Sequence, residues 1–205
     1  MSKITKIEEQ KKKKNRVNIY IDGEFSLGLY KDTLLKYHLY EGKEITKSEL
    51  SDIQQFEVLQ DAKDKALNYL SYRTRSKKEI KNYLYKKNFK EEIIYNIIND
   101  FENSGLIDDK TFAEMWVKDR SKRNPKGNLI LRKELVEKGI SEEIINSVLK
   151  NINEKENAKR AASKAIKKYH TKNNFEEKIL SYLSRRGFSY YLSKEVTCEI
   201  IEESK

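Results

Sequence analysis

One short sequence unit occurs three times in this chain. The first copy spans 76–89 and reads SKKEIKNYLYKKNF, and the second spans 127–140 and reads GNLILRKELVEKGI. A third, more diverged copy spans 175–188. Each copy predicts a short basic helix, a stop residue, an apolar residue and then another helix. Because such a unit cannot bury its apolar face alone, it must stack on its neighbours. The repeat therefore predicts an extended array, an architecture that commonly binds other macromolecules.

Each repeat is predicted to contain three helices. A longer helix precedes the repeated pair: it ends near Tyr72 in the first copy and spans about 109–123 and 154–169 in the others. Asn88, Gly139 and Gly187 fall just past the second helix of each copy, where Gly and Asn tolerate the left-handed conformation that ends a helix. The last two helices are thus joined by a tight turn, as in a helix-turn-helix.

The N-terminal part has a different pattern. Two runs of alternating apolar and polar residues, 17–21 and 25–29, flank Asp22-Gly23, which predicts a β-hairpin with a tight turn. A lone hairpin is marginal in water, so we expect a short helix at about 31–37 to support it through Leu34 and Leu35. Thr46 and Glu49 have capping-box spacing and predict the start of a long helix.

Composition favours thin helical layers over one thick core. Of 205 residues, 37% are apolar and 37% charged, and there is one proline. The prediction is a mainly α fold: tandem three-helix, helix-turn-helix-like repeats in an extended curved array, after a small N-terminal β-hairpin and helix. The expected parts are a basic flexible leader at 1–16, the hairpin and short helix at 17–45, and three-helix repeats at 46–107, 108–152 and 153–205.

The net charge of +10 favours an acidic partner such as nucleic acid. Basic residues are opposed only by Glu79 within 73–90 and only by Asp119 within 118–133. Such clusters suit phosphates or an acidic protein surface, although lysine on helix surfaces is also ordinary solvation. The candidate contact residues are Arg73, Arg75, Lys77, Lys78, Lys81, Lys86, Lys87, Arg120, Lys122, Arg123, Lys126, Arg132, Lys133, Arg185 and Arg186.

Several tyrosines lie near these basic residues and invite a second interpretation. They are Tyr72, Tyr83, Tyr85, Tyr190 and Tyr191. Exposed rings could stack on bases. Burial of the ring at a helix edge, with a hydrogen bond through the hydroxyl, is the favoured interpretation.

Catalysis finds little support in the sequence. His38 and His170 have no metal-binding spacing, and no Gly-rich phosphate loop is present. Asp108 and Asp109 suggest either a nuclease pair or, as we favour, a helix cap. Cys198 is the only cysteine, which fits a reducing cytosol. We therefore predict no enzyme, no catalytic residue, no metal and no cofactor. With no apolar run of membrane-spanning length and no signal core, we expect a cytoplasmic location.

Together these segments resemble the RecX family. The resemblance is carried by 66–80 (ALNYLSYRTRSKKEI), 105–109 (GLIDD) and 132–140 (RKELVEKGI), and by 17–22 (VNIYID) and 42–46 (GKEIT) near the start. It covers nearly the whole chain. It is weakest in the third repeat, where Gly187-Phe188 is the main anchor.

The resemblance implies a non-enzymatic bacterial regulator of the RecA recombinase. Such proteins bind in the groove of the RecA–single-stranded-DNA filament and restrain strand exchange, ATP hydrolysis and co-protease activity, and thus DNA repair, recombination and the SOS response. The expected partners are the RecA filament and single-stranded DNA, bound directly or through RecA, or double-stranded DNA. A monomer is expected, without membrane contact. The alternative is an autonomous basic DNA-binding repeat protein that acts without RecA.

Overall fold

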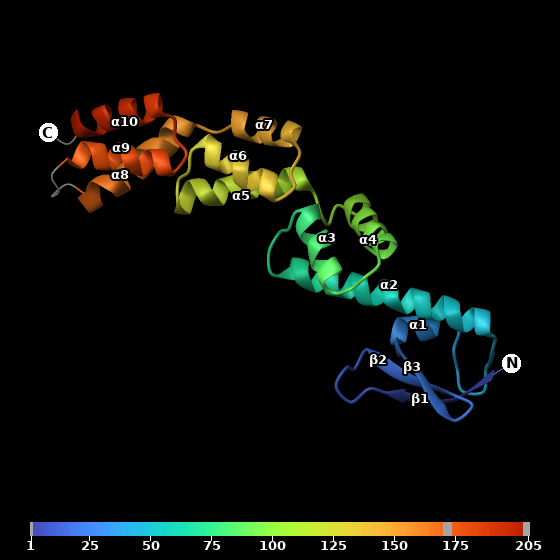
Figure 1. Cartoon of the computed structure of the whole chain (residues 1–205). Helices are drawn as coiled ribbons and strands as arrows, with labels where there is room; N and C mark the ends of the chain where they lie inside the picture. The colour runs from blue at the N-terminus through green and yellow to red at the C-terminus, as the bar shows by residue number, and fades with distance from the viewer. Residues whose placement is uncertain (1, 170–173, 203–205) are drawn as a thin grey trace. The chain divides into compact units, whose positions relative to one another are not determined.

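The computed structural model describes residues 2–169 and 174–202. The described chain contains a small β-sheet followed mainly by helices (Figure 1). It divides into two compact units. One comprises the chain up to Arg73 together with Tyr83–Asp100, and the other comprises Thr74–Asn82 and the chain from Phe101 onward. The division passes through α3 (Lys77–Lys86), inside the predicted first repeat.

The first unit opens with an antiparallel sheet of four strands in the order β3-β2-β1-β4. The strands are β1 (Ser2–Glu9), β2 (Arg16–Ile21), β3 (Glu24–Tyr30) and β4 (Glu44–Ile45). The hairpin prediction is confirmed, because Ile21 pairs with Glu24 across the two-residue turn. Asp22 and Gly23 both have positive φ, 50° and 89°, as this type of turn requires.

The prediction that the first sixteen residues form a flexible leader is wrong for the described part. β1 pairs with both β2 and β4, and Ile4 is fully buried. A register shift between Ile4 and Lys6 interrupts the alternation of the strand. For that reason Ile4 and Ile7, three positions apart, both contact the same core. The lysine run at 11–14 lies in the connection between β1 and β2 and is exposed.

Two helices cover this sheet. The first is α1 (Lys31–Lys36) and the second is α2 (Lys47–Ser71), which begins with the predicted capping box between Thr46 and Glu49. Leu34 packs against the sheet core as predicted. Leu35 does not: its side chain is 74% exposed.

A buried acid ties the sheet to α2. Glu57 lies on α2 and accepts hydrogen bonds from the Tyr30 backbone N–H at 3.0 Å and from the Thr33 hydroxyl. Arg16 from β2 lies 3.6 Å from the same carboxylate. A buried charge needs such partners, so this cluster fixes α2 on the sheet.

The rest of the first unit contains the end of α3 and most of α4 (Glu91–Asn103). Asn88, between them, has φ 63°, which confirms it as a stop residue. Tyr83 stacks on Tyr69 of α2 with ring centres 4.2 Å apart.

The second unit contains two three-helix groups (Figure 1). One consists of α5 (Asp109–Arg123), α6 (Asn128–Glu137) and α7 (Glu142–Lys150). The other consists of α8 (Glu154–Tyr169), α9 (Phe175–Arg185) and α10 (Tyr190–Glu202). Each group has its own apolar core. These helices fall inside the predicted repeats 108–152 and 153–205, whose boundaries remain predictions, as does the curvature of the array.

The two groups of the second unit meet at a close backbone contact. The N–H of Gly127, just before α6, donates to the carbonyl of Arg186 at 2.8 Å, and the next N–H, of Asn128, donates to Glu154 at 2.7 Å. A Cβ on Gly127 would clash with the Gly187 carbonyl. Only glycine therefore allows this approach.

The start of α3 meets the α5–α7 group in an equivalent way. The Lys77 N–H donates to Asp109, the first residue of α5, at 2.9 Å. The Ser76 hydroxyl donates to the Lys138 carbonyl at 2.8 Å. Lys138 precedes the stop residue Gly139 just as Arg186 precedes Gly187. The joint between successive groups is thus repeated along with the helices.

Candidate macromolecule-binding surface

Two of the candidate cations are held by an acid inside the α5–α7 group. Glu134 accepts hydrogen bonds from the Trp116 indole N–H at 2.9 Å, from Arg120 at 3.1 Å and from Lys126. Burial raises the pKa of Glu134, but these hydrogen bonds outweigh it and hold the pKa below its usual value. Arg120 also lies over the Trp116 ring at 4.3 Å. Arg120 and Lys126 are therefore engaged in packing.

Other candidates in the second unit also have intramolecular partners. Arg186 hydrogen-bonds the side chain of Asn124 and lies over the Tyr182 ring at 4.4 Å. Further pairs join Arg132 to Glu142 and Asn146, Arg123 to Asp119, and Arg185 to Ser181. The ion pair of Arg123 is solvent-exposed, and such pairs are weak enough to exchange for another anion.

The first basic cluster is partly engaged as well. Lys77 pairs with Glu102 at 2.5 Å, and the hydrogen bond to Glu102 raises the pKa of Lys77. The aliphatic chain of Lys78 lies against Gly139, and Lys87 lies over the Tyr83 ring at 5.7 Å. Three further candidates each have an interaction partner: Arg73, Arg75 and Lys81.

Three of the candidate cations remain available to an external anion. Lys86, Lys122 and Lys133 are exposed and form no ion pair or hydrogen bond with another described residue. Other exposed lysines that are not among the candidates also form no ion pair or hydrogen bond with a described residue, and Lys150 and Lys194 are two of them. Both lie outside the basic clusters, so charge density along the sequence gave no signal for them.

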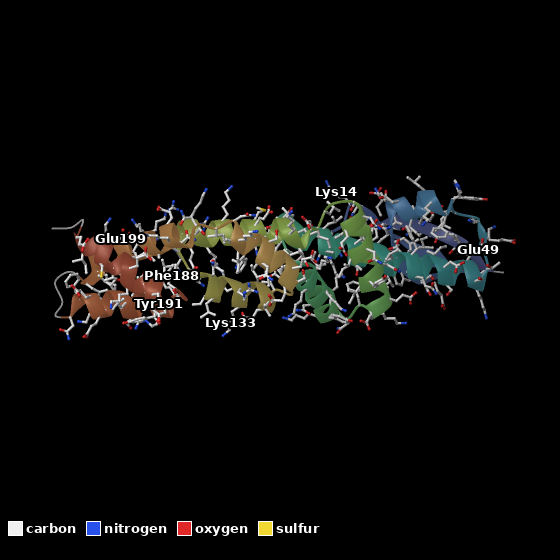
Figure 2. All side chains as sticks on the ribbon, turned by 90° about the horizontal axis from the view of Figure 1, so that it is seen from above. Lys14, Glu49, Lys133, Phe188, Tyr191 and Glu199 are labelled. Atoms are coloured by element: carbon white, nitrogen blue, oxygen red, sulfur yellow. The ribbon has the colours of Figure 1, made fainter. Side chains whose placement is uncertain are left out.

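The tyrosines divide into two groups. Tyr83 is half-buried, as the favoured interpretation required, but Tyr190 and Tyr191 are 64% and 85% exposed. For this pair the expectation of burial is wrong, because α10 turns its next residues, Leu192 and Ser193, toward the core instead. Figure 2 labels Tyr191 and Lys133 toward the same edge of the view. Tyr72 and Tyr85 are exposed as well, at 84% and 39%, so the expectation of burial is wrong for them too.

A groove of about 540 Å³ has Ser189, the residue before the tyrosine pair of α10, in its lining. Its lining includes Leu129 and Arg132 of α6 and Lys150, the last residue of α7. Phe188 and Ser189, which precede α10, also line it. Tyr190 and Tyr191 follow Ser189 directly in the chain. The lining combines the apolar Leu129, Leu149 and Phe188 with two cations, Arg132 and Lys150, and one acid, Glu154.

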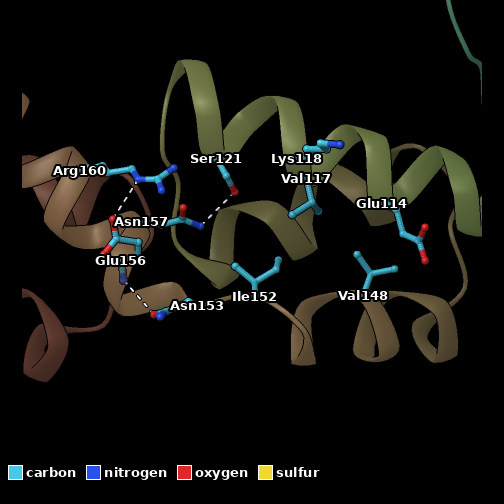
Figure 3. A pocket seen from close by; sticks show the side chains of 10 residues that line it. All are labelled: Glu114, Val117, Lys118, Ser121, Val148, Ile152, Asn153, Glu156, Asn157 and Arg160. Carbon is cyan, nitrogen blue, oxygen red and sulfur yellow. Dashed lines mark hydrogen bonds and ion pairs between the residues drawn. The ribbon is translucent and has the colours of Figure 1, made fainter.

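A smaller hollow of about 330 Å³ lies between α5 and the start of α8 (Figure 3). Asn157 donates to the Ser121 hydroxyl at 3.0 Å, and Arg160 pairs with Glu156 at 3.1 Å. Because these polar groups satisfy one another, the hollow has no convergent set of reactive groups.

The adjacent aspartates are structural, as favoured from the sequence. Asp108 caps α5 and accepts from the backbone N–H groups of Lys110 at 3.1 Å and Thr111 at 2.9 Å. The Thr111 hydroxyl is the main cause of a lowered pKa at Asp108. Asp109 points instead to Lys77, and burial raises its pKa. The two carboxylates therefore do not converge on one metal position.

Within the described residues, no group of three or more His, Cys, Asp or Glu side chains could hold a metal ion. His170 lies outside the described residues. In the same part of the chain, no helix is long and apolar enough to cross a membrane.

The fold defines a class: proteins of tandem three-helix units that follow a small antiparallel sheet. Family models assign the same parts. The Regulatory protein RecX N-terminal domain matches 2–46, the first three-helix domain of RecX matches 62–101, and the second matches 108–149. The chain belongs to the RecX family of regulatory proteins.

Individual relatives agree with the family models. Regulatory protein RecX of Listeria monocytogenes is 35% identical over 206 residues, which cover 98% of this chain and 77% of the relative. The Bacillus cytotoxicus protein of the same name is 36% identical over 92% of this chain and 73% of the relative.

Solved structures share the fold. A crystal structure of regulatory protein RecX has a TM-score of 0.74 and 30% identity, and covers 97% of this chain and 100% of that chain. RecX from Lactobacillus salivarius has a TM-score of 0.61 and 31% identity, over 69% of this chain and 96% of that chain.

Proposed function

We propose that this chain binds the RecA–single-stranded-DNA filament and restrains the recombinase, ATPase and co-protease activities of RecA in DNA repair, recombination and the SOS response. The observation that carries the proposal is membership of a family of regulatory proteins across nearly the whole chain. We further propose that it acts in the cytoplasm, as a monomer and without catalysis of its own.

Repeated units with exposed cations give this proposal a physical basis. Lys86 lies in the first predicted repeat, and Lys122 and Lys133 lie on two helices of the second. Each offers one weak electrostatic contact. Contacts made by linked modules combine through effective concentration, so modest single-site energies can give tight binding to a polymer. A filament presents its binding sites repeatedly, so several of these contacts can form at once. An isolated protein molecule would offer fewer of them.

The direct test is the DNA-dependent ATPase of the cognate RecA, titrated with this chain. We expect the rate to fall as the chain saturates the filament. A variant with Lys86, Lys122 and Lys133 replaced by Gln should need a higher concentration for the same inhibition. An unchanged ATPase rate at saturating wild-type chain would refute the proposal.

The same exposed cations favour one alternative, an autonomous DNA-binding protein. It predicts salt-sensitive binding to naked DNA that accounts for the biological effect without RecA. A pull-down in the absence of DNA separates the two. Retention of RecA on the immobilised chain after nuclease treatment would count against the alternative.

A further inference from the structure

Tyr190 and Tyr191 form an outward-facing pair of rings on the first turn of α10. Their ring centres lie 6.0 Å apart and their planes cross at 73°. Perpendicular rings cannot cover each other, so each retains a face open to solvent. Ser193 and Val196 of the same helix are buried in the α8–α10 core. At about 100° per residue, Tyr191 lies on the opposite side of the helix from them, and Tyr190 is the first residue of the helix.

One unengaged cation lies beside this pair. Lys194 lies one helical turn after Tyr190, where side chains are neighbours, and it forms no ion pair with any described residue. The next acid in the helix, Glu195, is taken by Lys155 at 2.5 Å. The pair of rings therefore has an unengaged cation one turn away, and the carboxylate that follows that cation is paired with Lys155.

The adjoining groove extends this basic surface. Lys150 is exposed at one end of the groove, and Arg132 lies on its wall with Glu142 and Asn146 as partners. The acid in the groove, Glu154, accepts the backbone N–H of Asn128. A polyanion lying in the groove would thus meet two cations, Lys150 and Arg132, and one carboxylate that is held by a backbone N–H.

Tyr95 shows that exposure alone does not create such a surface. It lies on α4 and is also 64% exposed. Its neighbours one turn earlier are Glu91 and Glu92, so a polyanion would be repelled there. Of these equally exposed tyrosine sites, only the α10 pair combines open rings with unengaged cations.

We propose that Tyr190 and Tyr191 stack on unpaired bases of single-stranded nucleic acid, while Lys194 and the groove cations hold its phosphates. Stacking needs bases whose faces are open, which a duplex does not offer, and it tolerates any base sequence. This inference rests on the proposed function, because it assigns a DNA contact to the same regulator. It also gives the third repeat a contact that the distribution of charge along the sequence did not favour.

The test uses the full chain without RecA. Fluorescence anisotropy with a labelled oligothymidylate at low salt should show binding that exceeds binding to a duplex of equal length. Replacing Tyr190 and Tyr191 together by Ala should weaken it by about tenfold or more, without changing the salt slope. The Phe pair should bind like wild type, since stacking does not need the hydroxyl. Lys194→Gln should lower the slope by about 0.7.

Tyr95→Ala is the matched control and should bind like wild type. Far-UV circular dichroism should show the same helix content for every variant, because all these side chains are exposed. Failure of the wild-type chain to bind the oligonucleotide would overturn the site, as would wild-type binding by the Ala pair or Ala-like weakness of the Phe pair. Loss of DNA-free RecA binding in the Ala pair, with oligonucleotide binding intact, would make it a protein contact instead.

The RecA ATPase separates this inference from the proposed function. Continued inhibition by a chain that does not bind the oligonucleotide would overturn the stacking site and leave the regulator standing. Oligonucleotide binding that depends on the tyrosines, without any effect on RecA, would support the site and refute the regulator.

Discussion

Glu134 shows how one residue can fix the structure of a repeat. Its carboxylate accepts from Trp116, Arg120 and Lys126, so Glu134→Gln should lower the free energy of unfolding by about 1–3 kcal/mol, because charge-assisted hydrogen bonds are lost. Chemical denaturation at neutral pH measures this. Glu137→Gln, an exposed change on the same helix, should have little effect. Equal losses in the two variants would contradict the assigned role.

The pKa of Glu134 gives this prediction a pH dependence. Its folded-state pKa lies below the usual value, so the folded state favours the ionised form. The contribution is therefore complete above the unfolded pKa of about 4.3 and is lost as the pH falls through the folded pKa. The stability difference between wild type and Glu134→Gln should shrink as the pH is lowered from 5 toward about 3. If this stability difference instead grows in acid, the pKa of Glu134 is raised on folding rather than lowered.

Asp108 carries a separate prediction at the start of α5. Asp108→Ala removes the acceptor for two backbone N–H groups and should cost about 1 kcal/mol of stability, as for other N-caps. Thermal or urea unfolding measures it. Asp108→Asn should retain most of the stability, since an amide oxygen also caps. If Asp108→Asn loses as much stability as Asp108→Ala, the charge of the carboxylate, rather than its role as a cap, stabilises the helix start.

For single residues, a role that depends on the neighbouring backbone could be predicted from the sequence. A role that depends on a partner on another helix could not. The cap at Asp108 and the stop at Gly139 depend only on neighbouring backbone, so residue type revealed them. The role of Arg120 depends on Glu134, which lies on the next helix, and the exposure of Tyr191 depends on how α10 rotates. Neither choice is visible from charge or spacing along the chain.

Among the elements, the helices followed the periodicity of the sequence and β1 did not. The helices α5 and α8 have the expected bounds. Asp108 caps the start of α5, and the buried alanines of α8 keep a helical spacing: Ala158, Ala161, Ala162 and Ala165. The first strand was missed because its register shift between Ile4 and Lys6 breaks the period of two and because the lysine run that follows it at 11–14 suggested a tail for the whole segment. The basic residues that suggested a tail lie partly in β1 and partly in the connection between β1 and β2.

A substitution at Gly127 tests the close backbone contact between the α5–α7 and α8–α10 groups. Gly127→Ala would place a methyl group against the Gly187 carbonyl, and because both are backbone positions the joint must open, at a cost of about 1–3 kcal/mol. Urea unfolding measures the loss. Gly28→Ala is the control: there a Cβ meets only the end of the flexible Gln10 side chain as a close contact. If the two substitutions prove equally mild, the close approach does not stabilise the joint.

At the scale of the whole molecule, net charge predicts the kind of partner but not the residues that meet it. The chain carries +10, yet many cations of the two basic clusters are engaged within the protein, as Lys126 and Lys77 are. Lys150 and Lys194, outside the clusters, are not engaged. Availability depends on which acids the fold brings near each cation, so it follows from tertiary structure alone.

This difference between total and available charge can be measured as a salt dependence. Replacing Lys86, Lys122 and Lys133 by Gln lowers the net charge from +10 to +7. If all three contact phosphates of the RecA–single-stranded-DNA filament, the slope of log affinity against log salt should fall by about 2, or about 0.7 for each contact. Anisotropy of a labelled filament across a salt series measures the slope.

The matched control removes the same charge elsewhere. Replacing Lys11, Lys12 and Lys13 by Gln also gives +7, and these exposed residues lie in the connection between β1 and β2, apart from both basic clusters. Its slope should stay near that of wild type, because counterion release counts phosphate contacts rather than the net charge of the protein. Equal reductions in the two variants would mean that the whole positive field, and not the exposed cations of the repeats, governs binding.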